Sequence, residues 1–280
     1  MAIVTSADRI QNELAVAFES LEGGPLILHS DLMRIGFVRK GKSIQEQLTD
    51  WVQMIREAAA GRTLLFPTFN YDYARTGVYR PLTDPGQVGV LGEHVRRLHP
   101  DQRTLTPIFN FVIVDGSGFP LEPVENPFSQ ESTFGAARRA GGSVAFLGAS
   151  FGANTFIHHV EEALEAPYRY IKPFPGILDL GDSPRAITLL YRVRPALSDA
   201  VEYDWHRLSE DLQARGILRR FPLGNAWLDF YQMEQLYDYW IGCLRQEETF
   251  LLTEASKARV QDLYGRFGKP LTFKAVEAGG

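Results

Sequence analysis

The chain of 280 residues is 45% hydrophobic, carries a formal net charge of −5 and contains one cysteine, Cys243. Such a chain can bury a substantial core, but it lacks the basic field of proteins that bind nucleic acid polymers or anionic membranes, and it cannot form an intrachain disulfide. No apolar run is long enough to span a bilayer, and the amphipathic N-terminus does not resemble a signal peptide, so we expect a cytoplasmic protein.

Helical and strand patterns alternate along most of the chain. Thr5 or Ser6 is placed to cap the first helix, and Ser43 with Glu46 three residues later has the spacing of a capping box. From about residue 195 onward we expect mostly helix. The expected order before that is helix 6–18, strand 25–29, helix 43–60, strand 64–66, an irregular segment 70–87, helix 89–99, strand 106–116, helix 132–140, strand 143–149, helix 154–166 and strand 185–195.

This alternation indicates the fold class. Several of the expected strands are short, continuous apolar runs, which are typical of strands covered on both faces. We therefore predict an α/β fold with a mixed or parallel central sheet flanked by helices and with a helical C-terminal elaboration. No linker divides the chain, so we expect residues 1–280 to form one domain.

Polar side chains follow the strand ends. In open α/β sheets ligands bind outside the carboxyl ends of the strands, so these groups are expected to converge on one cleft. The polar residues that follow the first, second and later strands are His29, Ser30 and Asp31; Thr68, Asn70 and Tyr71; and Asn154, Thr155 and His158.

The segment 154–168, NTFIHHVEEALEAPY, carries the densest set of titratable groups. Glu161 and Glu162 lie three and four residues after His158, on the same helical face, and Glu165 continues that face. A carboxylate beside an imidazole is the arrangement of a general base. A solvated acidic helix face explains the same spacing and is favoured by spacing alone, whereas a metal site lacks the HExxH ligand pattern.

Familiar catalytic motifs are missing from the sequence. It contains no phosphate-binding GxxxxGK[ST] loop, no GxGxxG that opens a helix after a strand, and no GxSxG nucleophile elbow. Ser30 or Asp31 could equally cap a short helix at 32–36. The loop at 70–81 is either a lid over a ligand or a packed surface loop.

Several segments, in order over about residues 25–170, resemble the aminoglycoside 3-N-acetyltransferases, a family distinct from the commoner GNAT acetyltransferases. The last of them is the most specific, because it matches an Asn-Thr-x-x-His-x-x-Glu helix start. The matching segments are LHSDLMRIGFV, LLFPTFNY, GVLGEHVRRLHPDQRTLTP, STFG and VAFLGASFGANTFIHHVEEALEAPY.

The resemblance implies transfer of an acetyl group from acetyl-CoA directly to an amine, with His158 as general base and Glu161 orienting its ring. No metal is expected. Around the cleft we expect acetyl-CoA to contact His29, Ser30, Asp31, Arg103 and Thr104, and the amine substrate to contact Thr68, Asn70, Tyr71, Asp72, Glu93 and Glu162. Two rival classes stay open: a thioesterase or amide hydrolase that uses the same His–Glu pair, and a non-catalytic binder of a cationic ligand.

The acceptor is expected to be a small amino sugar, either an aminoglycoside or a nucleotide-linked sugar. The aromatic loop 69–79 with Arg75 and Arg80 favours a sugar that carries one amine and an anionic handle, because rings suit sugar faces and guanidinium groups suit phosphates. Thr106 and Asn110 replace the His and Ser that the family commonly has near the cleft. A homodimer is one assembly that we consider.

Overall fold

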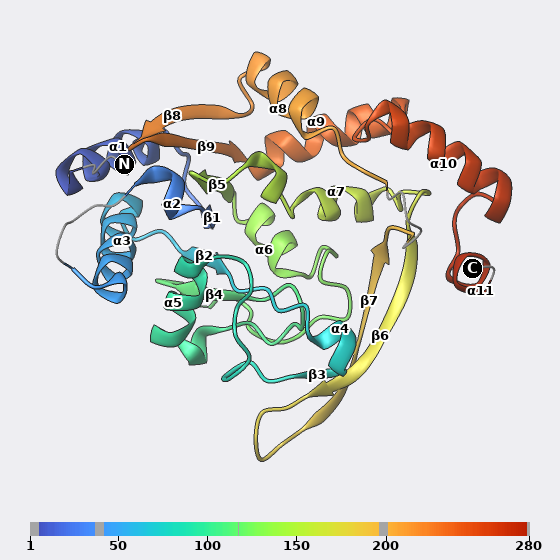
Figure 1. The fold of residues 1–280 in the computed structure, drawn as a ribbon, viewed down its shortest axis with the longest axis horizontal. Coiled ribbons are helices and arrows are strands. Elements are labelled where there is room, and N and C mark those ends of the chain that lie inside the picture. Colours follow the sequence, from blue (N-terminus) through green and yellow to red (C-terminus); the bar gives the residue numbers. More distant parts are fainter. Residues whose placement is uncertain (1–5, 37–41, 117, 196–200, 279–280) are drawn as a thin grey trace.

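The computed structural model describes residues 6–36, 42–116, 118–195 and 201–278. Its centre is a six-stranded sheet in the order β4–β2–β1–β5–β9–β8 (Figure 1). The strands are β1 (Leu26–Ser30), β2 (Leu64–Pro67), β4 (Phe111–Val114), β5 (Ser143–Leu147), β8 (Arg219–Leu223) and β9 (Ala226–Gln232).

The sheet is mixed, which confirms the predicted fold class. β1 runs parallel to both β2 and β5, so the carboxyl ends of these strands lie at one edge. β4 joins β2, and β9 joins β5, in antiparallel pairs. The central strands thus bring the segments after residues 30, 67 and 147 to the same side of the molecule.

Both faces of the sheet are covered, as continuous apolar strands require. Leu26 and Leu28 belong to one core cluster and Ile27 to the other, because successive side chains of a strand point to opposite faces. One cluster packs under α1 (Ala7–Glu19), α3 (Ile44–Ala59) and α5 (Val90–Leu98), whereas the other packs under α6 (Thr133–Arg139), α7 (Ile157–Ala163) and α9 (Met233–Gln246).

The caps of α1 and α3 are built as the sequence indicates. The Ser6 side chain accepts a hydrogen bond from the Arg9 N–H, and Ser43 and Glu46 form a reciprocal capping box. The alternative cap, Thr5, lies outside the described residues.

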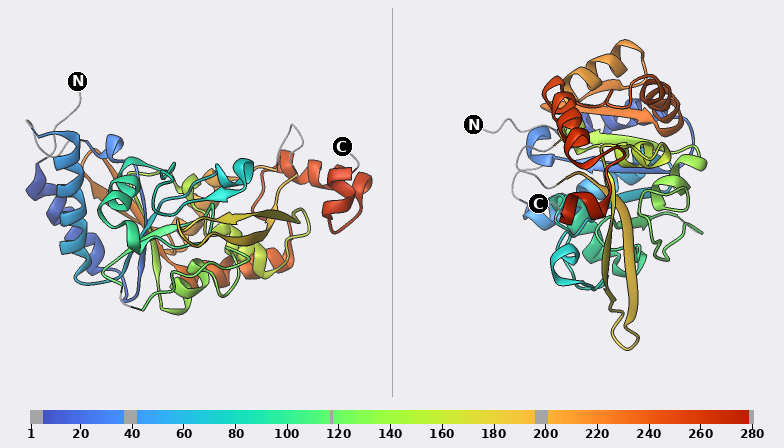
Figure 2. Two further views of the ribbon diagram at one scale, coloured as in Figure 1. Left: turned by 90° about the horizontal axis from the view of Figure 1, so that it is seen from below. Right: turned by 90° about the vertical axis from the view of Figure 1, so that its right-hand side faces the viewer.

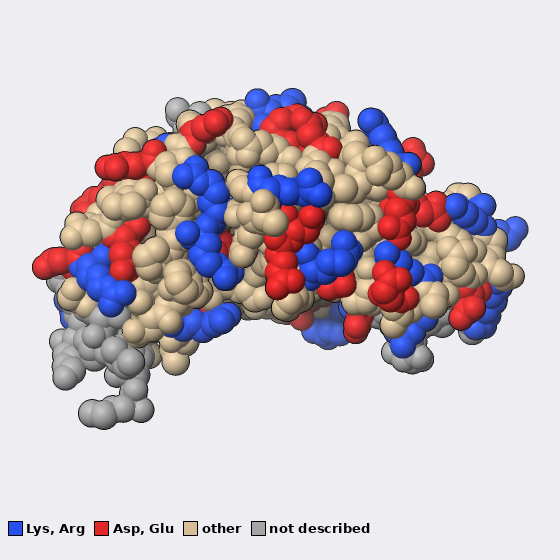
Figure 3. Space-filling view, turned by 90° about the horizontal axis from the view of Figure 1, so that it is seen from above, with Lys and Arg blue, Asp and Glu red and all other residues tan. Residues whose placement is uncertain are grey.

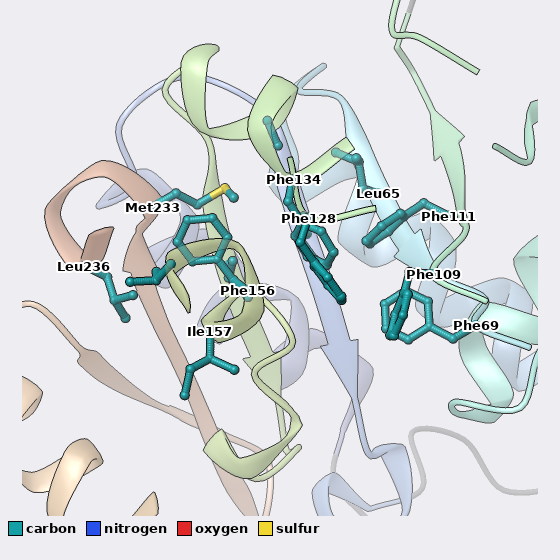
Figure 4. Close-up of a cluster of buried hydrophobic side chains, with 14 of the residues drawn as sticks. Leu65, Phe69, Phe109, Phe111, Phe128, Phe134, Phe156, Ile157, Met233 and Leu236 are labelled. Atoms are coloured by element: carbon teal, nitrogen blue, oxygen red, sulfur yellow. The ribbon is translucent and has the colours of Figure 1, made fainter. Parts of the chain in front are cut away.

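A series of aromatic rings fills the core cluster under α6, α7 and α9 (Figure 4). Phe111 lies edge-on to both Phe69 and Phe134, with ring centroids 5.3 and 5.2 Å apart. Phe128 stacks on Phe134 at 5.7 Å and contacts the ring of His158 at 5.1 Å. Such pairs fix ring orientation, so the core positions the histidine as well as stabilising the fold.

A second, three-stranded sheet comprises β3 (Val78–Tyr79), β6 (Tyr170–Leu178) and β7 (Arg185–Val193). Its long β6–β7 hairpin extends away from the central sheet (Figures 1 and 2). The sequence analysis missed β6, which contains Pro173 and Pro175. β3 pairs only with the last two residues of β6. On that side the rest of β6 is an open sheet edge, where proline is tolerated.

The regular structure of the C-terminal part is mostly helical, as predicted, but it also contains two strands that the sequence analysis missed. α8 (Trp205–Ala214), α9, α10 (Glu254–Phe267) and α11 (Phe273–Ala278) are helices, but β8 and β9 extend the central sheet. A two-residue Gly224–Asn225 turn joins these strands, and Gly224 has φ +59°. A glycine-led two-residue turn is a hairpin signal that the sequence did contain.

The outer surface is mixed in charge. On the face in Figure 3, acidic and basic side chains are interspersed.

Figure 2 shows α10 and α11 at the opposite end of the molecule from α1 and α3. Within the described ranges, no helix is long and apolar enough to cross a membrane.

Gly148, directly after β5, offers a test of the corner between the strand and the cleft. It has φ +67°, and a Cβ there would lie 2.6 Å from the Asp31 carbonyl oxygen and 2.7 Å from Ile35 Cγ1. We expect Gly148→Ala to lower the free energy of unfolding by about 2–5 kcal/mol, because left-handed strain and overpacking add together.

The matched control is Gly216→Ala, since Gly216 has φ +70° and a Cβ added there would meet nothing within 4 Å. Only the backbone strain applies at this position, about 1–2 kcal/mol. Urea denaturation of both variants gives the comparison, and equal losses would show that the corner is not tightly packed.

Candidate active site

A cleft of about 620 Å³ lies at the carboxyl edge of the central sheet. It is formed by the end of β1, the segment between β5 and α7, the strand β7 and the chain that leads into α8. Its polar lining residues are His29, Ser30, Tyr71, Asn154, Thr155, His158, Arg169, Tyr191, Arg194, Tyr203 and Trp205.

The helix that carries His158 starts later than expected. α7 begins at Ile157 with Phe156 at its N-cap position, and no side chain caps it. Asn154, predicted as a cap, instead accepts a hydrogen bond of 2.7 Å from the Tyr231 hydroxyl in the core. His158 therefore lies in the first turn, with 25% of its side chain exposed toward the cleft.

His158 and Glu161 are in direct contact. The Nδ1 atom of His158 lies 2.9 Å from a carboxylate oxygen of Glu161. Because an ionised carboxylate only accepts, Nδ1 carries the ring proton and Nε2 keeps its lone pair. Among the described residues, His158 makes its hydrogen bonds through Nδ1 alone, so Nε2 is available to a substrate.

Glu161 is itself held by a buried polar cluster. Its side chain is 1% exposed, and one oxygen lies 2.8 Å from Nε of Arg169. The Tyr168 hydroxyl donates to the other oxygen at 2.8 Å, and the Tyr203 hydroxyl lies 2.8 Å from both. Arg169 also donates to the Tyr203 hydroxyl.

This cluster sets the protonation states. Burial alone would raise the pKa of Glu161, but Arg169 and then His158 outweigh it and lower that pKa to about 2. Its stabilising charge is therefore complete above the ordinary pKa of 4.5 and is lost only as the pH falls toward 2. Burial, followed by Arg169, lowers the pKa of His158 below 6.5 although Glu161 opposes both. At neutral pH the pair is a carboxylate and a neutral imidazole.

Sequence reasoning missed the partners of Glu161. Tyr168 and Arg169 stand just after the helix in the printed segment EAPYRY, so proximity to the motif was a usable signal. Tyr203 lies more than forty positions after His158, in a part that was expected to be helical. Only the fold brings it to the carboxylate.

Of the expected acetyl-CoA contacts, His29 and Ser30 line the cleft. His29 stacks on Phe146 at 5.2 Å, and burial lowers its pKa to about 4, so the ring is neutral. Asp31 does not line the cleft, and its side chain makes no cap hydrogen bond to the short helix α2 (Leu32–Ile35).

Arg103 and Thr104 lie inside the protein, which corrects their assignment to the cofactor. Arg103 is 1% exposed, and its guanidinium donates to the carbonyls of Thr68 and Asp84 and to the Asn110 side chain, at 2.7, 2.6 and 2.9 Å. The Thr68 hydroxyl also donates to Asn110. Arg103 and Thr68 therefore hold the loop that follows β2 rather than a ligand, and the Thr104 hydroxyl accepts a hydrogen bond from the Phe111 N–H of β4.

Among the expected acceptor contacts, Tyr71 lines the cleft, but Asn70 is buried and donates to the Pro85 carbonyl. Asp72 accepts from Gln87 at 3.0 Å, and Glu93 is ion-paired with Arg96 at 2.7 Å. None of these carboxylates lines the cleft, so they are not placed to bind an amine there.

The remaining charged candidates also point elsewhere. Glu162 and Glu165 face Arg192, at 3.6 and 3.0 Å. Arg75 and Arg80, expected at the mouth, pair with Asp72 and Asp179 outside the cleft. Within the described ranges, no three His, Cys, Asp or Glu side chains converge as a metal site requires.

Comparison with known proteins identifies the family. A family model described as aminoglycoside 3-N-acetyltransferase matches residues 27–245, most of the chain. No curated protein matches in sequence.

Solved structures share the fold at low identity. A mutant of the aminoglycoside acetyltransferase AAC(3)-IVa in complex with a gentamicin has a TM-score of 0.72 and 18% identity, over 92% of this chain and 95% of its own. AAC-IIIb in a binary complex with CoASH has a TM-score of 0.69 and 17% identity, over 87% of this chain and 97% of its own. The YokD protein from Bacillus subtilis has a TM-score of 0.64 and 16% identity, over 86% of this chain and 94% of its own.

The polar cluster generates a test. Glu161→Gln leaves the Arg169 guanidinium buried without a counter-charge, so we expect the free energy of unfolding to fall by about 3–5 kcal/mol. In a double-mutant cycle with Arg169→Leu, the double variant should be more stable than the sum of the single losses predicts, because the orphaned charge is gone.

Glu165→Gln serves as the control, because its side chain is 78% exposed in a pair with Arg192. Exposed pairs contribute only about 0–1 kcal/mol. A loss for Glu161→Gln as small as the control's would mean that the ion pair does not hold the site together.

Proposed function

Because this chain belongs to the aminoglycoside 3-N-acetyltransferase family, and is thus an acetyl-CoA-dependent N-acyltransferase, we propose that it acetylates an amino group of an amino sugar with His158 as the general base. The observation that carries the proposal is the His158 ring, which lines the cleft and is fixed through Nδ1 by Glu161, while Nε2 makes no hydrogen bond to the described residues. That residues 1–280 form one acyltransferase domain stays a prediction.

In the proposed reaction, acetyl-CoA supplies the acetyl group as a thioester. The substrate nitrogen bonds to the thioester carbonyl carbon, and its proton passes to Nε2 of His158. The carbon–sulfur bond breaks, and the thiolate that leaves takes up a proton. Glu161 stabilises the imidazolium that forms, since its carboxylate lies 2.9 Å from Nδ1.

The shape of the cleft supports a long cosubstrate. A second hollow of about 610 Å³ adjoins the first, and both are lined by Ala149, Gly152 and Trp205. Arg34, on α2, lines the second hollow. We place the thioester end of acetyl-CoA beside His158 and its phosphates near Arg34, since guanidinium groups bind phosphates.

The first test removes the base. We expect His158→Ala and the more conservative His158→Gln to lower kcat about 10²–10⁴-fold, with little change in affinity for acetyl-CoA. Release of free thiol, measured with and without an amine, follows the reaction. Thiol release that needs no amine would identify a hydrolase instead, and near-normal turnover of both variants would exclude His158 as the base.

His159→Gln is the matched control on the same helix. The His159 ring is fully buried and hydrogen-bonded through Nδ1 to the Phe128 carbonyl at 2.8 Å, away from the cleft. We expect this variant to lose stability but to keep the kcat of its folded fraction. A drop equal to that of His158→Ala would point to general disruption of α7.

The pH dependence gives a second test. A general base must be neutral, so kcat/KM, which reports the groups of the free enzyme, should rise with pH through the pKa of His158 and then level off. Burial and Arg169 lower that pKa, so the acid limb should lie below the ordinary value of 6.5. Glu161→Gln should move the limb further down, because the carboxylate is the group that raises this pKa. A limb above 7 that Glu161→Gln leaves in place would contradict the assignment.

A further inference from the structure

The charge of the cleft wall is unusual for a site that receives an amine. The described side chains that line it include two guanidinium groups, Arg169 and Arg194, and no carboxylate. Glu161 lies behind the wall with 1% exposure and is already paired. A ligand in this cleft therefore meets more positive than negative charge.

Arg194 carries the excess charge. Arg169 is neutralised by Glu161 at 2.8 Å, whereas the only hydrogen bond of Arg194 within the described ranges is a long one, 3.4 Å, to the Val201 carbonyl. None of the described carboxylates pairs with it. Arg194 is exposed directly after β7 and lines the same cleft as His158.

The same wall offers ring faces. Tyr71 is 49% exposed at the cleft, and Tyr191 and Trp205 also line it. Aromatic faces pack against the apolar face of a sugar ring while the sugar hydroxyls stay hydrated. Rings together with a guanidinium that pairs with none of the described carboxylates fit a sugar that bears an anionic group.

A polycation fits this wall poorly. Each ammonium that leaves water needs a carboxylate or another acceptor to offset its desolvation. The carboxylates of Asp72, Glu93 and Glu162, which the sequence analysis expected at the cleft, contact Gln87, Arg96 and Arg192 instead.

We propose, building on the acetyl transfer proposed above, that the acceptor is an amine that also carries a phosphate or a carboxylate, and that Arg194 binds this anionic group. Arg194 is then a specificity-determining residue. The anion is held at the β7 side of the cleft, and the amine reaches Nε2 of His158. Transfer to a polycationic aminoglycoside is disfavoured by the same charge.

The phosphates of acetyl-CoA are a rival partner for Arg194. They are separated from the thioester by the pantetheine arm, and the second hollow with Arg34 is available for them. Arg194 lines only the first hollow, beside His158. Kinetics separate the two assignments, because one affects KM for the acceptor and the other KM for acetyl-CoA.

The experiment compares acceptors that differ in charge but share an amine. Glucosamine, glucosamine 6-phosphate, muramic acid and gentamicin are assayed with acetyl-CoA by thiol release, using the full chain. We expect glucosamine 6-phosphate or muramic acid to exceed glucosamine in kcat/KM about 10–100-fold, the value of a charge-assisted hydrogen bond. This preference should shrink as salt is added.

Arg194→Gln should raise KM for the anionic acceptor by a similar factor, remove the preference over glucosamine and leave KM for acetyl-CoA unchanged. Arg185→Gln is the matched control, because Arg185 lies at the other end of β7 in an exposed pair with Glu122. It should leave both KM values as they are.

The other outcomes of this experiment overturn or uphold the anion site at Arg194 as follows. Gentamicin as the best acceptor, or no preference for the anionic acceptors, overturns the inference but leaves acetyl transfer intact. A rise in KM for acetyl-CoA alone assigns Arg194 to the coenzyme and also overturns it. If no amine reacts, acetyl transfer to amino sugars fails. Thermal-shift binding of glucosamine 6-phosphate then decides: binding lost in Arg194→Gln upholds the anion site, and no binding overturns it.

Discussion

The buried contact between Glu161 and Arg169 is the interaction on which the site depends. A carboxylate with 1% exposure is costly to bury, and it persists because Arg169, Tyr168 and Tyr203 satisfy both of its oxygens. These partners come from the segment before β6 and from the chain that leads into α8. One charge thus ties three parts of the fold together and, through Nδ1 of His158, fixes the orientation of the proposed base.

The apolar core and the polar site are continuous. Phe128 packs on Phe134 in the core and on the ring of His158 at the cleft. A loss of packing beneath α7 would therefore alter the position of the histidine as well as the stability of the fold. Arg103, which the sequence analysis assigned to acetyl-CoA, is likewise structural: it is bonded to the Asn110 side chain and to the Thr68 carbonyl and fastens the loop after β2.

Family membership defines the reaction class more firmly than it defines the acceptor. The central sheet is set by packing, and the proposed role of the His–Glu pair is proton transfer, which every acceptor amine requires. The cleft wall is built from β7 and the segments around residues 71 and 205, which lie outside the central sheet and are free to differ in charge. The proposed anionic acceptor follows from that wall and not from the fold.

Features under the control of local physics could be predicted from the amino-acid sequence alone. They include the capping box at Ser43, the buried strands β1, β2 and β5, and the spacing that places Glu161 beside His158. The remaining features depend on the folded chain. Two prolines concealed the strand pattern of β6. Arg103 is buried among carbonyl groups, whereas Arg194 is exposed at the cleft and pairs with none of the described carboxylates. Local patterns record which face of an element is apolar, whereas the partner of a charge is set by chain segments that meet only in the folded protein.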